Sequence, residues 1–406
     1  TPSSARFTGS DPMRGEGLAV WLLALGQTLT YAALYYSFAA LLPHLEAETG
    51  WTKAQLAAGP TFAFLLTAAL TMLTGRLVDR GWGGEMLILM PLIGAGGLLG
   101  LSEAASPAAW FWIWGLIGLA QAGCVYETCF AFLTRRLGPG ARAAITRITL
   151  VAGFASTLAF PLGELLGRHL GGRNALLAFA GLVVGGVVPL NLWGVGILRR
   201  MERQGGKRPA PEPGALSAAL RHPSFWLLTA IFGAIWLNHA ILITYALPLF
   251  ADRGAAPGLA VLAASCIGPA QVAGRLLLML NERRVDNRAA TLIALGCILL
   301  AAALLWVAGA APGLIFAFAL AQGSGAGLLS ILRPVLQAEK LGRQGFGAVS
   351  GALAIAPILA NAAGPSAGAL LLQSGGPDAV YAACLLLAAL GLGFGGWLVR
   401  RPPVSQ

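Results

Sequence analysis

The sequence predicts an all-α membrane protein whose twelve transmembrane helices form two six-helix bundles related by pseudo-twofold symmetry. Three observations predict this fold class. The 406 residues are 57% hydrophobic and only 11% charged, whereas soluble globular chains carry about 25% charged residues. The apolar residues gather in runs close to the ~20 residues that cross a bilayer. One long polar segment divides these runs six to six.

Apolar runs between charged residues, prolines and glycine clusters define the expected helices. Six runs precede the polar segment and six follow it. The predicted transmembrane spans are 18–42, 55–77, 86–104, 108–134, 144–168 and 174–198, then 223–250, 258–280, 289–309, 313–339, 346–372 and 378–399.

The polar segment, 199–222, reads RRMERQGGKRPAPEPGALSAALRH. Its proline, glycine and charge content predicts a cytoplasmic linker. The linker separates an N-terminal bundle, 18–198, from a C-terminal bundle, 223–401. We expect tails at 1–17 and 402–406, and we interpret the opening TPSSARFTGSDP as a cloning remnant.

The basic residues predict the orientation in the membrane. With an even number of spans both termini lie on one side, and 23 lysines and arginines then fall on that side. Four fall on the other side, which accounts for all 27. Because cytoplasmic loops carry the excess of Lys and Arg, we expect both termini in the cytoplasm of a bacterial inner membrane. The four residues on the opposite side are Lys53, Arg168, Arg173 and Arg253.

Composition also argues against several function classes. The net charge of +11 does not indicate nucleic-acid binding, because the basic residues fall between apolar runs. The five cysteines lie inside apolar runs without CxxC spacing, so we expect neither disulfides nor a metal site. The chain has no P-loop, H-E-x-x-H or G-x-S-x-G pattern. We therefore expect no enzyme activity and no cofactor.

The two halves contain similar segments. FPLGELLGRHLGGRNA, from Phe160, aligns without gaps with GPSAGALLLQSGGPDA, from Gly364, at an offset of 204 residues. LLPHL and ALPLF share a proline at an offset of 205. Similar offsets at both ends of a half indicate a duplicated six-helix unit, and parallel repeats of this kind occur in a large class of secondary transporters.

The segment GRLVDRGWGG, 75–84, places three charged residues directly after an apolar run. GRLVDR resembles the G-x-L-x-D-R signature of the major facilitator superfamily. The spans, the linker and the repeat extend this resemblance to nearly the whole chain. It implies the major facilitator fold, in which Gly75 lets the second helix approach the eleventh. It also implies that Asp79 faces the start of the eleventh helix, where an acidic group is favourable.

The resemblance implies that basic residues complete a cytoplasmic gate. Arg135 or Arg136 is expected beside Asp79 to add a charge-assisted hydrogen bond, and Arg76 and Arg80 also fix the topology. The second half has GRLLLMLNERR, which keeps a glycine and Arg275 but lacks the aspartate, so we expect a weaker second gate. The alternative interpretation of GRLVDR is an ordinary positively charged cytoplasmic loop. Arg333 completes the gate candidates, although it can also extend to the membrane surface.

Within the superfamily, YYSFAALLPHLEAETGW and ITLVAGFAS are similar to segments of bacterial members of the monocarboxylate-transporter-like branch. The drug-exporter antiporter signature has a glycine before a proline in the fifth helix. Here AFPLG has Phe160 before that proline, which argues against drug/proton antiport.

Polar side chains at membrane depth are functional candidates. In the first predicted helix, Gln27, Tyr31 and Tyr35 recur every four residues and share one face. They can contact a substrate or pack between helices. In the fourth, Gln121 and Glu127 lie near one face.

Glu127 lies about 13 Å from the cytoplasmic end of its helix at 1.5 Å per residue. A carboxyl group at that depth can bind and release a proton near neutral pH. The alternatives are an ion pair with Arg147, which enters the next helix from the same side, or direct contact with substrate.

The second half supplies the remaining candidates. His239 is the second candidate proton carrier, because imidazole titrates in the physiological range; a merely hydrogen-bonded histidine is the alternative. The other candidates for the substrate cavity in this half are Asn238, Tyr245, Gln271, Gln322 and Asn361.

These observations predict a secondary active transporter working by alternating access. We expect coupling to protons and a small organic anion as substrate, with Arg147 among the cavity residues. The alternatives are proton-driven efflux of amphipathic drugs and, more remotely, a non-transporting receptor or scaffold. The expected partners are the small-molecule substrate, protons and the lipid bilayer, with no nucleic acid and a monomeric chain.

Overall fold

The computed structural model describes residues 12–205, 214–281 and 284–402, and every regular element in these ranges is a helix. The predicted all-α fold class is confirmed. Three parts of the predicted tails and linker lie outside the described residues, namely 1–11, 206–213 and 403–406.

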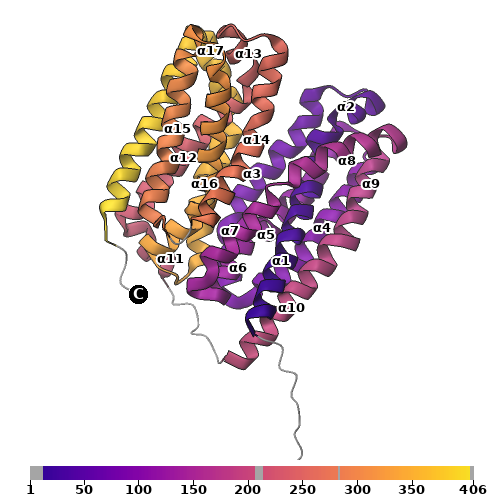
Figure 1. Ribbon diagram of the computed structural model, residues 1–406. Helices are drawn as coiled ribbons and strands as arrows, with labels where there is room; N and C mark the ends of the chain where they lie inside the picture. The colour runs from indigo at the N-terminus through magenta and orange to yellow at the C-terminus, as the bar shows by residue number, and fades with distance from the viewer. Residues whose placement is uncertain (1–11, 206–213, 282–283, 403–406) are drawn as a thin grey trace, which may run out of the picture.

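The helices form two bundles that stand side by side (Figure 1). The first bundle runs from indigo to magenta in the figure. Its helices are α1 (Pro12–Tyr31), η1 (Ala32–Tyr36), α2 (Ser37–Thr49), α3 (Lys53–Leu77), η2 (Val78–Trp82), α4 (Gly83–Ser102), α5 (Pro107–Cys124), α6 (Tyr126–Leu137), η3 (Gly138–Gly140), α7 (Ala141–Ala152), α8 (Ala155–Leu170), α9 (Gly172–Leu182), η4 (Val183–Val187) and α10 (Val188–Gly205).

The second bundle follows the linker and is drawn from rose to yellow (Figure 1). Its helices are α11 (Ala215–Arg221), α12 (Pro223–Thr244), α13 (Ala246–Asp252), α14 (Pro257–Leu280), α15 (Asn287–Val307), η5 (Ala308–Ala310), α16 (Leu314–Leu341) and α17 (Phe346–Arg400).

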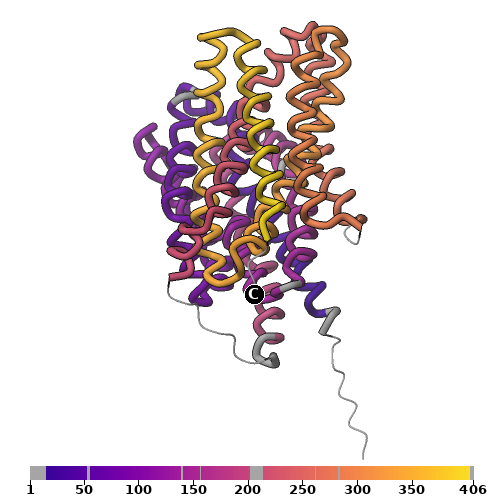
Figure 2. Tube along the Cα trace, turned by 90° about the vertical axis from the view of Figure 1, so that its left-hand side faces the viewer, coloured from indigo at the N-terminus to yellow at the C-terminus, as the bar shows by residue number. Residues whose placement is uncertain are grey.

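Ten helical segments of the described chain are long and apolar enough to cross a membrane. Two of them, Gln55–Ser102 and Phe346–Arg400, each contain a sharp break at glycine. Gly81 has φ 103° and Gly376 has φ 66°, values in the left-handed region that glycine adopts without a steric penalty. Each segment therefore holds two crossings, and Figure 2 shows α17 turning back on itself. The twelve predicted spans correspond to these crossings.

Three predicted spans are not continuous helices. The span predicted over 108–134 is interrupted at Val125, and the span over 144–168 is interrupted at Gly153 and Phe154. The span over 223–250 divides between α12 and α13 at Tyr245. Hydropathy cannot locate such breaks, because the chain stays apolar through them.

The predicted linker, 199–222, contains more helix than its composition indicates. The last transmembrane helix of the first bundle, α10, continues to Gly205, and α11 forms a short helix before α12. Both described ends of the predicted linker are therefore helical.

Local sequence sets several helix starts. Thr52 and Gln55 form a capping box at the start of α3, and the Asp286 side chain accepts from the Ala289 amide at 2.7 Å at the start of α15. Ser106 caps α5 directly before a proline in its first turn.

The bundles meet at one end of the molecule and diverge toward the other (Figure 1). The start of α1, the end of α10 and the end of α17 lie at the end where they meet (Figures 1 and 2). We call it the linker end and the opposite one the far end. Phe346 of α17 is 2% exposed and packs at the linker end among first-bundle residues that include Val78 and Phe132.

Candidate functional site

A buried carboxylate joins the bundles at the linker end. Asp79 accepts hydrogen bonds from the backbone amides of Gly347 at 2.8 Å and Ala348 at 2.9 Å. Both amides belong to the first turn of α17, where helix N–H groups lack intrahelical partners. Asp79 is 8% exposed, so its charge lies at the positive end of a helix dipole with little solvent between them.

Close backbone contact makes this carboxylate contact possible. A Cβ atom on Gly75 would lie 1.9 Å from the carbonyl oxygen of Gly347, and a Cβ on Gly347 would lie 2.2 Å from the carbonyl oxygen of Gly75. One turn further along, the Thr71 hydroxyl donates to the carbonyl of Gly351 at 3.1 Å. Glycine at 75 therefore lets α3 and α17 touch along their backbones.

The four arginines predicted around this contact differ in what their side chains contact. Arg135 donates to the backbone carbonyl of Asp79 and not to the carboxylate, where an arginine was predicted. Arg136 lies over the Phe132 ring, 5.2 Å from its centroid. The side chains of Arg76 and Arg80 are exposed.

A second contact between the bundles lies deeper in the membrane. Arg333 of α16 donates to Glu127 of α6 at 2.5 Å, and these side chains are 13% and 16% exposed. Glu127 therefore forms an ion pair with Arg333 and not with Arg147, whose side chain is exposed. Arg333 points into the interface between the bundles and does not extend to the membrane surface.

Arg275 forms a third contact across the interface. It donates to the carbonyl of Thr149 in the first bundle at 3.0 Å and to the carbonyl of Gly327 at 3.3 Å. Its third partner is the amide oxygen of Gln271 at 3.4 Å. Arg275 is 6% exposed, and no carboxylate contacts it among the residues the structure describes. Gln271 therefore positions this guanidinium.

The fourth transmembrane segment is broken at Val125, close to the ion pair of Glu127 with Arg333. Val125 has an extended backbone between α5 and α6, which frees carbonyl groups in the middle of the membrane. The Gln27 amide donates to the carbonyl of Cys124 at 2.8 Å and satisfies one of them. Gln121 donates to the carbonyl of Leu34 at 2.7 Å, inside the π-helical turn η1. Both glutamines therefore stabilise irregular backbone.

Tyrosine rings surround this break. The ring centroids of Tyr31 and Tyr126 are 4.5 Å apart, those of Tyr31 and Tyr35 are 5.6 Å apart, and those of Tyr35 and Tyr36 are 4.9 Å apart. Tyr35 is 39% exposed. Tyr36 and Tyr126 were not among the predicted site residues, although each is adjacent to one of them. We call Tyr31, Tyr35, Tyr36 and Tyr126 the tyrosine cluster.

The polar candidates of the second bundle form a neutral network. The Gln322 amide donates to the Asn238 side chain at 3.3 Å and lies 3.2 Å from His239 Nδ1, while Asn238 donates to the carbonyl of Cys384 at 2.8 Å. His239 therefore accepts a hydrogen bond from a neutral amide in this arrangement.

Two further candidates lie apart from that network. The Tyr245 hydroxyl donates to the carbonyl of Pro365 at 2.7 Å and connects the break between α12 and α13 to α17. The Asn361 side chain is exposed on α17.

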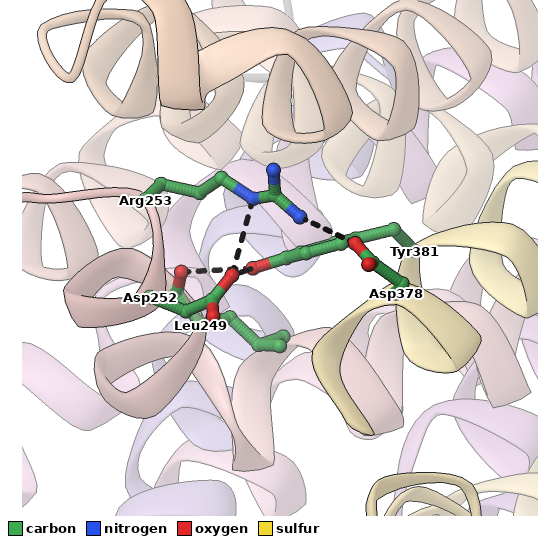
Figure 3. A network of polar contacts seen from close by, with 5 residues as sticks. All are labelled: Leu249, Asp252, Arg253, Asp378 and Tyr381. Carbon is green, nitrogen blue, oxygen red and sulfur yellow. Dashed lines mark hydrogen bonds and ion pairs between the residues drawn. The ribbon is translucent and has the colours of Figure 1, made fainter. Parts of the chain in front are cut away.

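Charged residues outside the predicted site occur at equivalent places in the two halves. At the far end, Arg253 contacts Asp378 at 3.0 Å and stacks 3.9 Å from the centroid of the Tyr381 ring (Figure 3). In the first bundle, Glu48 accepts from the backbone amide of Arg173 at 3.0 Å. Arg253 follows Glu48 by 205 residues, and Asp378 follows Arg173 by the same offset, so the acid and the base are exchanged between the halves.

Two helical bundles of transmembrane length, joined at one end by buried polar contacts, define a multi-pass membrane transporter of the two-bundle class. A family model described as Major Facilitator Superfamily matches residues 23–357, and the chain belongs to this superfamily. The predicted superfamily is therefore confirmed.

Solved structures of low sequence identity share the fold. The human organic anion transporter MFSD10 (TETRAN) is similar with a TM-score of 0.67 and 18% identity, over 95% of this chain and 100% of that one. A bacterial homologue of the iron transporter ferroportin, in an outward-facing state, is similar with a TM-score of 0.69 and 15% identity, over 95% and 99% of the two chains. No curated protein matches the chain in sequence.

Proposed function

We propose that the protein is a proton-coupled secondary transporter of a small organic anion that works by alternating access. The main observation in support is the ion pair between Glu127 and Arg333, which joins the two bundles at membrane depth. A titratable acid at this place can link proton binding to the opening of the linker end.

The coupling follows from electrostatics. Protonation of Glu127 removes the charge that Arg333 faces, and separating the charged pair would leave an uncompensated buried charge, which costs about 3–5 kcal/mol. A proton therefore lowers the free energy of the open linker end relative to the closed one. His239 is the second candidate proton carrier, but proton uptake at its Nδ1 would break the hydrogen bond with Gln322.

The proposed charge of the substrate rests on Arg275. A guanidinium that is 6% exposed, with only neutral partners among the described residues, lacks a counter-charge. A substrate carboxylate can supply that charge, because charge-assisted hydrogen bonds to arginine are strong. Arg147 is a second cation for the anion, and the tyrosine cluster can contact an organic body. The likeness to a human organic anion transporter agrees with this class, at 18% identity.

The proposed orientation follows the distribution of basic residues. With both termini cytoplasmic in a bacterial inner membrane, the linker end is the cytoplasmic side, and the arrangement of the helices is outward-facing. The bundles 18–198 and 223–401 then rock about their interface as a monomer. We place the chain in the monocarboxylate-transporter-like branch on its first and fifth predicted helices.

Purified protein in proteoliposomes tests this proposal. Radiolabelled carboxylates, with a cationic amphipathic drug as the comparison, are offered under an imposed pH gradient. The proposal predicts carboxylate accumulation on the alkaline side and its collapse when a protonophore is added. Drug movement toward the acidic side would support the efflux alternative, and the absence of any solute movement would support a receptor or scaffold.

A further inference from the structure

A groove of about 540 Å³ lies on the surface of the second bundle, between α15 and the C-terminal part of α17. In Figure 1, α15 and the yellow C-terminal part of α17 lie on the side of this bundle away from the first one. The groove is therefore separate from the interface between the bundles. Its lining residues are Leu299, Ala389, Leu392, Gly393, Gly396, Trp397 and Arg400.

The floor of the groove is formed by Gly393 and Gly396, which have no side chains, and its walls are mainly apolar side chains. A Cβ atom added to Gly393 or Gly396 would meet no atom within 4 Å. From Ala389 to Arg400 the helix rises about 16 Å at 1.5 Å per residue, close to half of the ~30 Å hydrocarbon thickness. The groove thus runs from one membrane surface to the middle of the bilayer, as one acyl chain of a single leaflet does.

The end of the groove near the membrane surface is cationic. Arg400 is exposed in the last turn of α17 and forms no ion pair within the described part of the chain. Trp397 is 53% exposed, and Arg401 stacks 4.9 Å from the centroid of a Trp397 ring. Tryptophan concentrates at membrane interfaces, and basic residues there attract anionic headgroups.

The equivalent helix of the first bundle keeps the exposed tryptophan but has no cation at the position of Arg400. Trp193, which is 61% exposed, precedes Trp397 by 204 residues, and at the same offset Gly196 replaces Arg400. A Cβ on Gly196 would also meet no atom within 4 Å. Gly196 is therefore a matched control position.

We propose that the groove binds one anionic phospholipid from the leaflet at the linker end. Its acyl chain lies over Gly393 and Gly396, and its phosphate contacts Arg400. We infer an acyl chain because the groove is long and has apolar walls. We infer an anionic headgroup because the exposed guanidinium of Arg400 lies at the end of the groove. This site is independent of the proposed substrate and coupling ion.

Native mass spectrometry of the purified full chain tests the site by titration with phosphatidylglycerol and phosphatidylcholine of equal chain length. The wild type is expected to bind one phosphatidylglycerol about fivefold more tightly than phosphatidylcholine, the ratio that one basic residue near the surface provides. Arg400→Gln should remove this preference. Gly396→Leu should lower the occupancy of both lipids by filling the groove, whereas Gly196→Leu should not.

Several outcomes would overturn the proposal. These are equal affinity of the wild type for the two lipids, and unchanged occupancy in both Gly396→Leu and Gly393→Leu. A lipid-free dimer that Gly396→Leu dissociates would assign the groove to a second copy of the chain. Elution of each variant as a single species in size-exclusion chromatography controls for folding, and two filling variants keep the test decisive if one of them misfolds.

Discussion

Asp79 acts on the second bundle through two backbone amides rather than through an arginine. Because both carboxylate oxygens accept from the first turn of α17, the contact depends on the negative charge and on the shape of the carboxylate. Arg135 stabilises the turn that carries Asp79 through its backbone carbonyl. At the residue scale, this contact between the bundles is therefore a helix N-terminus bound by an anion.

Asp79→Asn tests this interpretation. The asparagine amide group keeps one acceptor and turns a donor toward a donating N–H, so the contact should weaken by about 1–2 kcal/mol. Solute uptake in proteoliposomes should fall several-fold, while expression and membrane insertion stay normal. Glu103→Gln at the far end is the control, and full uptake by Asp79→Asn would contradict the gate.

Gly75→Ala tests the close backbone contact. The new Cβ would lie 1.9 Å from a carbonyl oxygen of α17, so the bundles should separate at the linker end. Spin labels at Arg80 and Arg221 should report a longer distance than in the wild type. Gly96→Ala introduces the same atom where no neighbour lies within 4 Å, and it should leave the distance unchanged. A wild-type distance in Gly75→Ala would show that the contact does not hold the bundles together.

At the element scale, the break between α5 and α6 determines the direction of the side chains in the candidate site. It places Tyr126 and Glu127 in the first turn of a new helix, with Tyr126 against Tyr31 and Glu127 against Arg333. An unbroken helix would turn these side chains differently. We therefore expect the glutamine that satisfies the broken backbone to matter for stability.

Gln27→Leu should lower thermal stability in detergent. It leaves the carbonyl of Cys124 without its donor, and such hydrogen bonds in membranes contribute on the order of 1 kcal/mol. A fall in Tm of a few degrees is expected, measured by the fluorescence of a thiol-reactive dye or by differential scanning fluorimetry. Leu25→Ala, on an exposed position of the same helix, is the control. An unchanged Tm would mean that the break needs no support from Gln27.

Sequence patterns located the helices and the gate motif, and the family resemblance placed Asp79 at the start of the eleventh helix. They did not indicate the ion pair between Glu127 and Arg333. The apolar runs and GRLVDR are local signals, so the spans, Gly75 and Asp79 could be assigned from neighbouring residues alone. Glu127 and Arg333 are 206 residues apart, and nothing local in either helix indicates the other. The break at Val125 is equally hidden, because no proline lies beside it to mark the end of a helix.

At the scale of the whole molecule, the two halves carry charged residues of opposite sign at positions 205 residues apart. Glu48 and Arg173 at the far end of the first bundle correspond to Arg253 and Asp378 in the second (Figure 3). Each pair lies within one bundle, so neither of these two contacts joins the bundles at the far end. The polar contacts between bundles described above, by contrast, involve Asp79, Glu127, Arg275 and Thr71 of helices that meet toward the linker end. This asymmetry fits rocking of two rigid bundles.

We propose that Glu127 couples proton binding to this rocking motion. Carboxylate accumulation driven by a pH gradient, compared with carboxylate exchange at equal pH, tests it in Glu127→Gln proteoliposomes. Glu164→Gln is the control, because Glu164 pairs with His44 and Arg168 inside the first bundle. We predict that Glu127→Gln retains exchange but loses accumulation, whereas Glu164→Gln retains both. Accumulation at the wild-type level in Glu127→Gln would contradict the account.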